Sequence, residues 1–192
     1  MYDCQWFPYA GLYANVGLLK EINQILVTSR GKSKRRTARM DKAILTYYNT
    51  EKILEIKNRW KNSNLESHIK KILGQAIEAH IRGEYVLTVS CLATMWEGLL
   101  KQKMPIKKRK KEELKNDIKG LVVDNGYEKI LGDYYNNLII STCYGLEDVK
   151  EGVPNRNGIA HSWYKKYPNK KASLNAILLT DFLINLNPKE TA

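Results

Sequence analysis

The sequence contains no run of about eighteen consecutive apolar residues, which excludes a transmembrane helix. Residues 1–16 also lack the features of a secretory signal peptide. Asp3 stands where such a peptide carries positive charge, and no continuous apolar stretch leads to a small-residue cleavage site. These absences predict a cytoplasmic protein with no membrane partner.

Cysteine is scarce and scattered along the chain. The 3 cysteines, Cys4, Cys91 and Cys143, form no CxxC pair and have no neighbouring histidine at ligand spacing. This distribution excludes a disulfide framework and a structural zinc site. We therefore expect neither a metal nor an organic cofactor.

Acidic residues are outnumbered by basic ones. The 192 residues include 32 Lys and Arg against 20 Asp and Glu, which gives a formal net charge of +12. Clustered cations gain affinity for a phosphate backbone by displacing counterions, so this charge favours a polyanionic partner such as RNA. A solvated basic surface, or attraction to an anionic membrane, would give the same composition. Hydrophobic residues make up 43% of the chain, which is enough for a folded core.

The apolar residues repeat at helical spacing, and sustained alternation of the kind that indicates strands is absent. The clearest stripe contains Ile69, Leu73 and Ile77 and stops at Gly83, a typical C-terminal cap. The predicted fold class is all-α. Helices are expected over residues 15–28, 39–60, 64–83, 84–103, 107–124, 127–142 and 168–186.

The first 63 residues differ in character from the rest. An aromatic-rich segment over residues 1–13 is expected to pack on a larger body, and the basic run over residues 30–39 suits an exposed, mobile linker. We predict an N-terminal helical extension with a basic linker over residues 1–63. A bundle of about four or five helices is predicted over residues 64–187.

One of the 3 histidines has an unusual setting. His68 and His80 fall within an expected amphipathic helix and are interpreted as structural. His161 lies in a polar, glycine-containing segment, residues 153–164, just before the last helix. Polar loops at the end of a helical bundle often carry catalytic side chains, so we expect the functional site here.

Arg156 and His161 supply complementary chemistry. An arginine stays charged and its planar donors match phosphate oxygens, so Arg156 can hold a phosphodiester and offset charge in a transition state. A histidine titrates near neutral pH and can transfer a proton. Together they suffice for attack of a ribose 2′-hydroxyl on its neighbouring phosphate without a metal. The Asn157 amide can orient the phosphate or the imidazole.

Arg156 and His161 are separated by five positions, which places them about 140° apart on a regular helix. They converge only if the segment is partly non-helical or if a second subunit contributes. The structural alternative is a helix-cap region that carries a surface arginine and a half-buried histidine.

The pattern Arg-Asn-x-x-x-His before a terminal amphipathic helix resembles the HEPN superfamily. Residues 76–85 and 96–99 look like the helix pair that precedes the motif in bacterial members, and residues 167–183 look like their closing helix. The resemblance covers about residues 64–186 and assigns nothing to residues 1–63. It implies a HEPN-like helical bundle that forms a homodimer, with the RxxxxH motif lining a cleft between two protomers.

Many HEPN members are metal-independent endoribonucleases of toxin-antitoxin, anti-phage and stress systems. The resemblance implies that Arg156 binds and stabilises the scissile phosphate of RNA and that His161 is the general acid or base. Asn157 matches the polar residue that commonly follows the motif arginine. An antitoxin or regulatory protein is an implied further partner. Other members are RNA-binding, nucleotide-binding or protein-binding modules without nuclease activity, and this alternative stays open.

Several further residues are site candidates, each with a structural alternative. Glu97 is a candidate carboxylate to hold Arg156 or His161 in place, or an ordinary salt-bridge residue. Trp163 and Tyr164 can stack on unpaired bases or belong to a core or dimer interface. Candidate RNA contacts, which are otherwise solvated cations, are Lys165, Lys166, Lys170, Lys171, Lys107, Lys108 and Arg109. The run over residues 30–39 has the same two interpretations, and a third as a contact for an acidic antitoxin.

Overall fold

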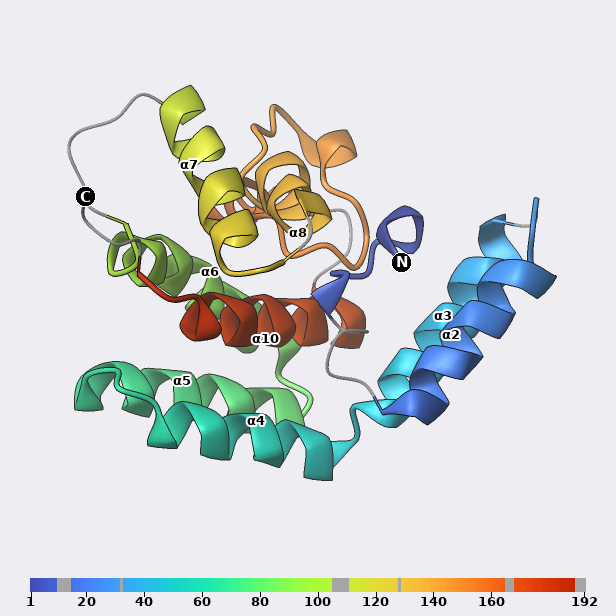
Figure 1. Cartoon of the computed structure of the whole chain (residues 1–192), viewed down its shortest axis with the longest axis horizontal. Helices are drawn as coiled ribbons and strands as arrows, with labels where there is room; N and C mark the ends of the chain where they lie inside the picture. The colour runs from blue at the N-terminus through green and yellow to red at the C-terminus, as the bar shows by residue number, and fades with distance from the viewer. Residues whose placement is uncertain (10–14, 32, 105–110, 128, 165–167, 189–192) are drawn as a thin grey trace.

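The computed structural model describes residues 1–9, 15–31, 33–104, 111–127, 129–164 and 168–188 (Figure 1). Every regular element in these ranges is helical, which confirms the predicted all-α class. Two 3₁₀ turns are η1 (Tyr2–Cys4) and η3 (Leu146–Asp148), and η2 (Tyr135–Ile139) is a π-helical turn. The α-helices are α2 (Val16–Thr28), α3 (Ser33–Tyr47), α4 (Thr50–Asn62), α5 (Ser67–Ile81), α6 (Tyr85–Lys101), α7 (Lys111–Asp124), α8 (Lys129–Tyr134), α9 (Arg156–Ala160) and α10 (Lys170–Asn185).

Helix α10 forms the centre of the molecule. All of its residues from Lys171 to Ile184 are buried, so this helix has no solvent-facing side over that length. Figure 1 shows α10 between the α4–α5 pair on one side and α7 and α8 on the other, and α6 packs along it. In the part of the chain that the structure describes, no helix is both long enough and apolar enough to cross a membrane.

An asparagine caps the N-terminus of four of the described helices, and a glycine follows the C-terminus of another. The side-chain oxygens of Asn15, Asn49, Asn155 and Asn169 accept hydrogen bonds from backbone N–H groups at the starts of α2, α4, α9 and α10. These bonds satisfy donors that have no partner within a helix. After α5 the chain turns at Gly83, whose φ of +81° suits glycine, and this confirms the predicted cap.

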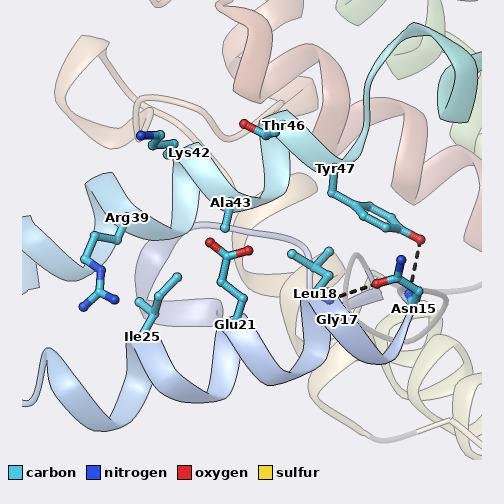
Figure 2. A pocket seen from close by; sticks show the side chains of 10 residues that line it. All are labelled: Asn15, Gly17, Leu18, Glu21, Ile25, Arg39, Lys42, Ala43, Thr46 and Tyr47. Atoms are coloured by element: carbon cyan, nitrogen blue, oxygen red, sulfur yellow. Dashed lines mark hydrogen bonds between the residues drawn. The ribbon is translucent and has the colours of Figure 1, made fainter.

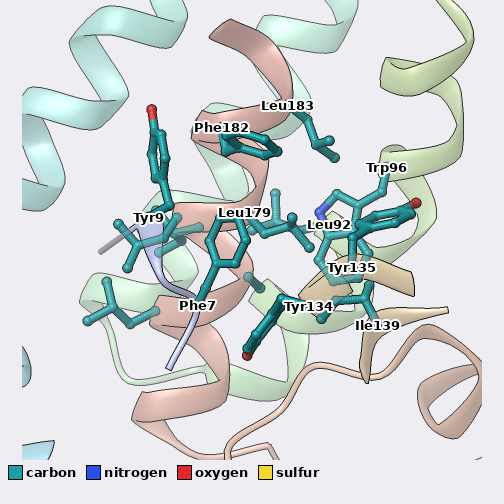
Figure 3. Close-up of a cluster of buried hydrophobic side chains, with 14 of the residues drawn as sticks. Phe7, Tyr9, Leu92, Trp96, Tyr134, Tyr135, Ile139, Leu179, Phe182 and Leu183 are labelled. Carbon is teal, nitrogen blue, oxygen red and sulfur yellow. The ribbon is translucent and has the colours of Figure 1, made fainter. Parts of the chain in front are cut away.

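The aromatic N-terminal segment packs against α10, which confirms the expectation that it packs on a larger body. Phe7 and Tyr9 lie against Phe182 in the buried cluster of Figure 3. The backbone N–H of Phe7 donates to Asn175 Oδ1, and Asn175 Nδ2 donates to the carbonyl oxygens of Gln5 and Gly152, each at 2.9 Å. One buried cluster therefore includes residues on both sides of the expected boundary at residue 63. The rest of the aromatic segment, residues 10–13, lies outside the described residues.

Two sequence expectations about the N-terminal region are wrong. Residues 33–39 begin α3 and are not a linker, because the strong helix formers Lys and Arg lead into a stripe in which Met40 and Ile44 are fully buried. The helix expected over residues 39–60 is two helices, because Asn49 caps a new helix after α3 ends. Figure 1 shows α2 and α3 as a hairpin beside the main body.

His80 on α5 is a buried histidine with a hydrogen-bond partner. Its side chain lies within the interior, and its Nδ1 is 2.7 Å from Ser173 Oγ on α10. Burial, with a smaller effect from the charge of Lys170, lowers the pKa of His80 from 6.5 to about 4. The imidazole is therefore neutral in the folded protein near neutral pH.

Acid is expected to destabilise the fold through His80. Because the pKa of His80 is lower in the folded state, the unfolded chain binds more protons between about pH 6.5 and about pH 4. The stability that depends on neutral His80 is fully present above about pH 6.5. Between about pH 6.5 and about pH 4 it falls by about 1.4 kcal/mol for each unit by which the pH drops. Between about pH 7 and about pH 5, the free energy of unfolding in urea should fall by about 2 kcal/mol more in the wild type than in His80→Asn.

Asparagine is the appropriate replacement because its amide reaches the Nδ1 position and can keep the bond to Ser173. His68→Asn is the matched control, since the His68 side chain is 67% exposed. The same pH dependence in His80→Asn as in the wild type would show that another group senses acid.

Candidate functional site

The motif residues lie at the two ends of a short helix. Helix α9 begins at Arg156 and ends at Ala160, and His161 follows as its C-terminal cap with φ −102° and ψ 6°. Ser162 then has a φ of +57°, in the left-handed region, where the chain leaves the helix. The predicted polar loop is therefore helical over Arg156–Ala160, with irregular backbone before and after this helix.

Asn155 holds the start of α9 to the preceding loop. Its side chain is buried, and Oδ1 accepts from the backbone N–H of Gly158 at 2.8 Å and from the Cys143 thiol at 3.2 Å. Its Nδ2 donates to the Leu138 carbonyl oxygen at 2.6 Å and to Ser141 Oγ at 2.9 Å. One side chain thus caps α9 and satisfies the end of the π-helical turn η2. Asn155 was not among the site residues expected from the sequence, although an asparagine three positions before Gly158 is a typical helix-start signal.

The loop before α9 also fixes Asn157 and Gly158. Asn157 Nδ2 donates to the carbonyl oxygen of Ser141 at 2.9 Å and to that of Ile140 at 3.3 Å. A Cβ on Gly158 would lie 2.5 Å from Val149 Cγ2, so only glycine fits this close approach. The donor group of Asn157 is therefore engaged by the loop, and the backbone of α9 is clamped.

Arg156 projects from α9 toward α6. One of its guanidinium nitrogens is 3.1 Å from Glu97 Oε2, and the other carboxylate oxygen of Glu97 is 3.0 Å from Lys101 Nζ. The hydrogen bond from Lys101, with the charges of Lys101 and Arg156, holds the pKa of Glu97 below its usual value. Because the side chains of Arg156 and Glu97 are 41% and 50% exposed, this pair adds little stability and can exchange for another anion.

His161 lies on the surface and stacks on an aromatic ring. Its imidazole and the Trp163 ring have centroids 4.7 Å apart and planes inclined by 27°. The backbone N–H of Trp163 donates to the Gly158 carbonyl oxygen at 2.9 Å, so the turn after α9 places this ring. Among the described residues, Glu97 forms an ion pair with Arg156 and none with His161, and no hydrogen bond joins the two motif side chains.

Of the other candidate residues, one supports the loop, one is an exposed cation, and five lie outside the described residues. Tyr164 is half-buried, and its hydroxyl donates to the Val153 carbonyl oxygen at 3.2 Å, so it supports the loop. Burial raises the pKa of Tyr164. Lys170 is exposed at the start of α10. The candidates that lie outside the described residues are Lys107, Lys108, Arg109, Lys165 and Lys166.

Lys171 is not a surface cation, and its assignment as an RNA contact is wrong. Its ammonium donates to Asp41 Oδ1 and to the Cys4 carbonyl oxygen, both at 2.7 Å, and lies 5.2 Å from the centre of the Trp6 ring. The Trp6 indole N–H donates to the same Asp41 oxygen at 2.7 Å. This buried group ties α10 to α3 and to the N-terminal segment.

A buried carboxylate that was not expected from the sequence joins α4 to α10. Asp181 is buried and accepts from the Trp60 indole N–H and from Arg59, each at 2.8 Å. A cavity of about 100 Å³ lies beside it and is lined in part by Tyr9 and Tyr48. Since both oxygens of Asp181 have donors, we interpret this group as structural.

The described residues contain no group of three or more His, Cys, Asp or Glu side chains placed to hold a metal ion. Helix α9 and its cap offer a guanidinium, an imidazole and an adjacent indole ring on a clamped backbone. Such groups can bind a phosphate, transfer a proton and contact a base. Comparison with known proteins finds no matching family model, no matching curated protein and no matching solved structure.

Proposed function

We propose that this protein is a metal-independent endoribonuclease of the HEPN type. The observation that carries the proposal is the position of Arg156 and His161 at the two ends of one clamped helix, with both side chains reaching solvent. Asn155 and Gly158 fix the backbone that presents them, which is the support a catalytic pair requires. Cellular RNA is the proposed substrate, and toxin-antitoxin or anti-phage defence is the proposed setting.

The proposed reaction is an internal transesterification of RNA. The ribose 2′-oxygen attacks the neighbouring phosphorus, its proton passes to a base, and the bond from phosphorus to the 5′-oxygen breaks as that oxygen takes up a proton. Arg156 exchanges Glu97 for the scissile phosphate and offsets the charge that develops on it. His161 transfers a proton. The products are a cyclic phosphate and a free 5′-hydroxyl.

The proposed enzyme acts as a homodimer with a composite site. Within one chain, Arg156 and His161 lie at the two ends of α9, and no hydrogen bond joins their side chains. A second copy of α9 would supply the missing partner for each residue. In this arrangement the imidazole of one copy can act as the base and the imidazole of the other copy as the acid.

The alternative is a module that binds RNA, a nucleotide or a protein without turnover. The contacts of Arg156 with Glu97, and of Asn157 with the preceding loop, favour this alternative, because they engage two motif side chains in ordinary structural interactions. Binding without cleavage under the conditions below would support it.

Incubation of the purified protein with total bacterial RNA in EDTA tests the proposal. We expect fragments with cyclic-phosphate and 5′-hydroxyl ends from the wild type and none from His161→Ala. Mapping of the product ends distinguishes this chemistry from metal-dependent hydrolysis. Fragments that appear only when magnesium is added, or equally with both proteins, would contradict the proposal.

A further inference from the structure

Positive charge is concentrated on the hairpin of α2 and α3, which lies to one side of the main body in Figure 1. Six described residues between positions 30 and 42 are basic, and Asp41 is the one acidic residue among them. That carboxylate is already bound by Lys171 and by the Trp6 indole. The basic residues are Arg30, Lys34, Arg35, Arg36, Arg39 and Lys42.

Two of the basic residues have partners within the fold. Arg39 donates to Thr28 Oγ1 at 2.7 Å and to Ser29 Oγ at 3.3 Å, across the turn between the helices. Arg36 is partly buried, with Asp3 3.9 Å away. The other four, which we call the hairpin cations, are exposed and contact no acidic side chain among the described residues: Arg30, Lys34, Arg35 and Lys42.

Local stability does not account for the hairpin cations. The first turn of α3 contains Lys34, Arg35 and Arg36 and no acidic residue. A helix N-terminus is the positive end of the helix dipole, so a cation there costs about 0.3–1 kcal/mol at low salt. Neighbouring like charges add repulsion. Charges placed against the dipole are better explained by a ligand that they bind.

The hairpin presents its cations on a fixed backbone. Met40 and Ile44 are fully buried on the inner face of α3, and the bond from Lys171 to Asp41 ties that helix to α10. A groove of about 560 Å³ lies between α2 and α3, and its lining includes Glu21 as well as Arg39 and Lys42 (Figure 2). The charged surface is therefore organised before any ligand arrives.

The residues beside the hairpin cations indicate the class of ligand. At 100° per residue, Ala38 and Thr46 fall on the same face of α3 as Arg35 and Lys42, and both are small and exposed. The exposed large apolar side chains of the hairpin all belong to α2, and they are Val16, Leu19, Leu26 and Val27. A protein partner or a lipid bilayer requires large apolar anchors beside the charges, whereas a phosphate backbone requires only cations. The composition of the α3 face, which lacks such anchors, thus favours a nucleic acid.

We infer that the hairpin cations form an RNA-backbone contact, distinct from α9, that holds the substrate strand while cleavage occurs at the motif. The choice of RNA as the polyanion rests on the proposed function. The contact is independent of sequence, because lysine and arginine on a small polar face recognise phosphates and not bases.

Salt-dependent binding of a single-stranded 2′-O-methyl RNA, which lacks the attacking hydroxyl, tests the inference. The variant Lys34→Gln/Arg35→Gln removes two hairpin cations, and Lys61→Gln/Lys71→Gln removes two exposed cations of α4 and α5 as the matched control. For two lost phosphate contacts, the slope of log affinity against log salt should fall by about 1.4. We expect affinity to fall about tenfold in the hairpin variant and to stay near that of the wild type in the control.

Equal losses in the two variants would show that net charge alone attracts RNA, and unchanged binding in the hairpin variant would place the contact elsewhere. Either result overturns the inference. So would a finding that these cations are needed for binding to phosphatidylglycerol vesicles or to a poly-glutamate peptide and are not needed for binding to RNA. Cleavage of a dinucleotide by the unaltered protein tests the proposed function separately. Hairpin-dependent binding without that cleavage would support the contact and contradict the nuclease.

Discussion

Replacing His161 with alanine is expected to slow RNA cleavage by about 10²- to 10⁴-fold, because the variant loses the group that transfers a proton in the transition state. The fold should be unaffected, since His161 is exposed and its side chain stacks on Trp163 at the surface. The measurement is the initial rate of cleavage of a labelled RNA in EDTA, with helix content followed by circular dichroism.

His68→Ala is the matched control for this experiment. His68 is also exposed, but it lies on α5 and is not near the motif in sequence. We expect the control to cleave RNA at the rate of the wild type. A rate for His161→Ala close to that of the wild type would contradict a catalytic role, and an equal loss in both variants would indicate an indirect effect.

Arg156 should show a loss similar to that of His161 for a different reason. Removing one group that stabilises transition-state charge typically costs about 10²- to 10³-fold in rate. Since the exposed pair with Glu97 adds little stability, the loss in Arg156→Ala should appear in the rate and not in the free energy of unfolding. Those two measurements separate a catalytic arginine from a structural one.

Local signals in the sequence predicted α2, α5, α6 and α10 close to their observed bounds. In the structure the side chain of Asn15 caps the start of α2, and α5 is followed by a glycine with positive φ, so short-range chemistry defines these two ends. The first half of α3 was harder to predict. Its early residues are almost all basic, and they are helical because Met40 and Ile44, further along the chain, are buried against the body.

Contacts between distant residues explain what the sequence could not reveal. Lys171 appears next to another lysine at a helix start, which is typical of a solvated side chain. It is buried because Asp41, 130 positions away, and the Cys4 carbonyl, 167 positions away, provide its partners. The pair of Arg156 with Glu97 spans 59 positions, and it was anticipated only because both side chains were already site candidates.

Helix α9 shows the same limit at the site itself. Five residues are too few for an apolar stripe to be visible, and a helix of that length is not stable in isolation. The chemistry of the motif could be inferred from residue types, but its backbone conformation depends on the buried side chain of Asn155. Tertiary hydrogen bonds therefore decide whether Arg156 begins a helix.

Asn155→Ala is accordingly expected to destabilise the protein by about 3 kcal/mol. Loss of a helix cap costs about 1 kcal/mol, and each buried polar group left without a partner adds about 1–3 kcal/mol. The Leu138 carbonyl oxygen and Ser141 Oγ would lose their donor in the same variant. The measurement is the free energy of unfolding in urea.

Asn49→Ala separates the cap from the buried network. Asn49 is exposed, and its side chain only accepts from the Lys52 backbone N–H at the start of α4, so this variant should lose about 1 kcal/mol. Asn155→Asp should fall between the two, because the carboxylate keeps the cap but cannot donate to Leu138. Equal losses in Asn155→Ala and Asn49→Ala would mean that the network around α9 adds nothing beyond capping. The larger loss, together with slower cleavage by the folded fraction of Asn155→Ala, would show that this network positions Arg156 for the proposed reaction.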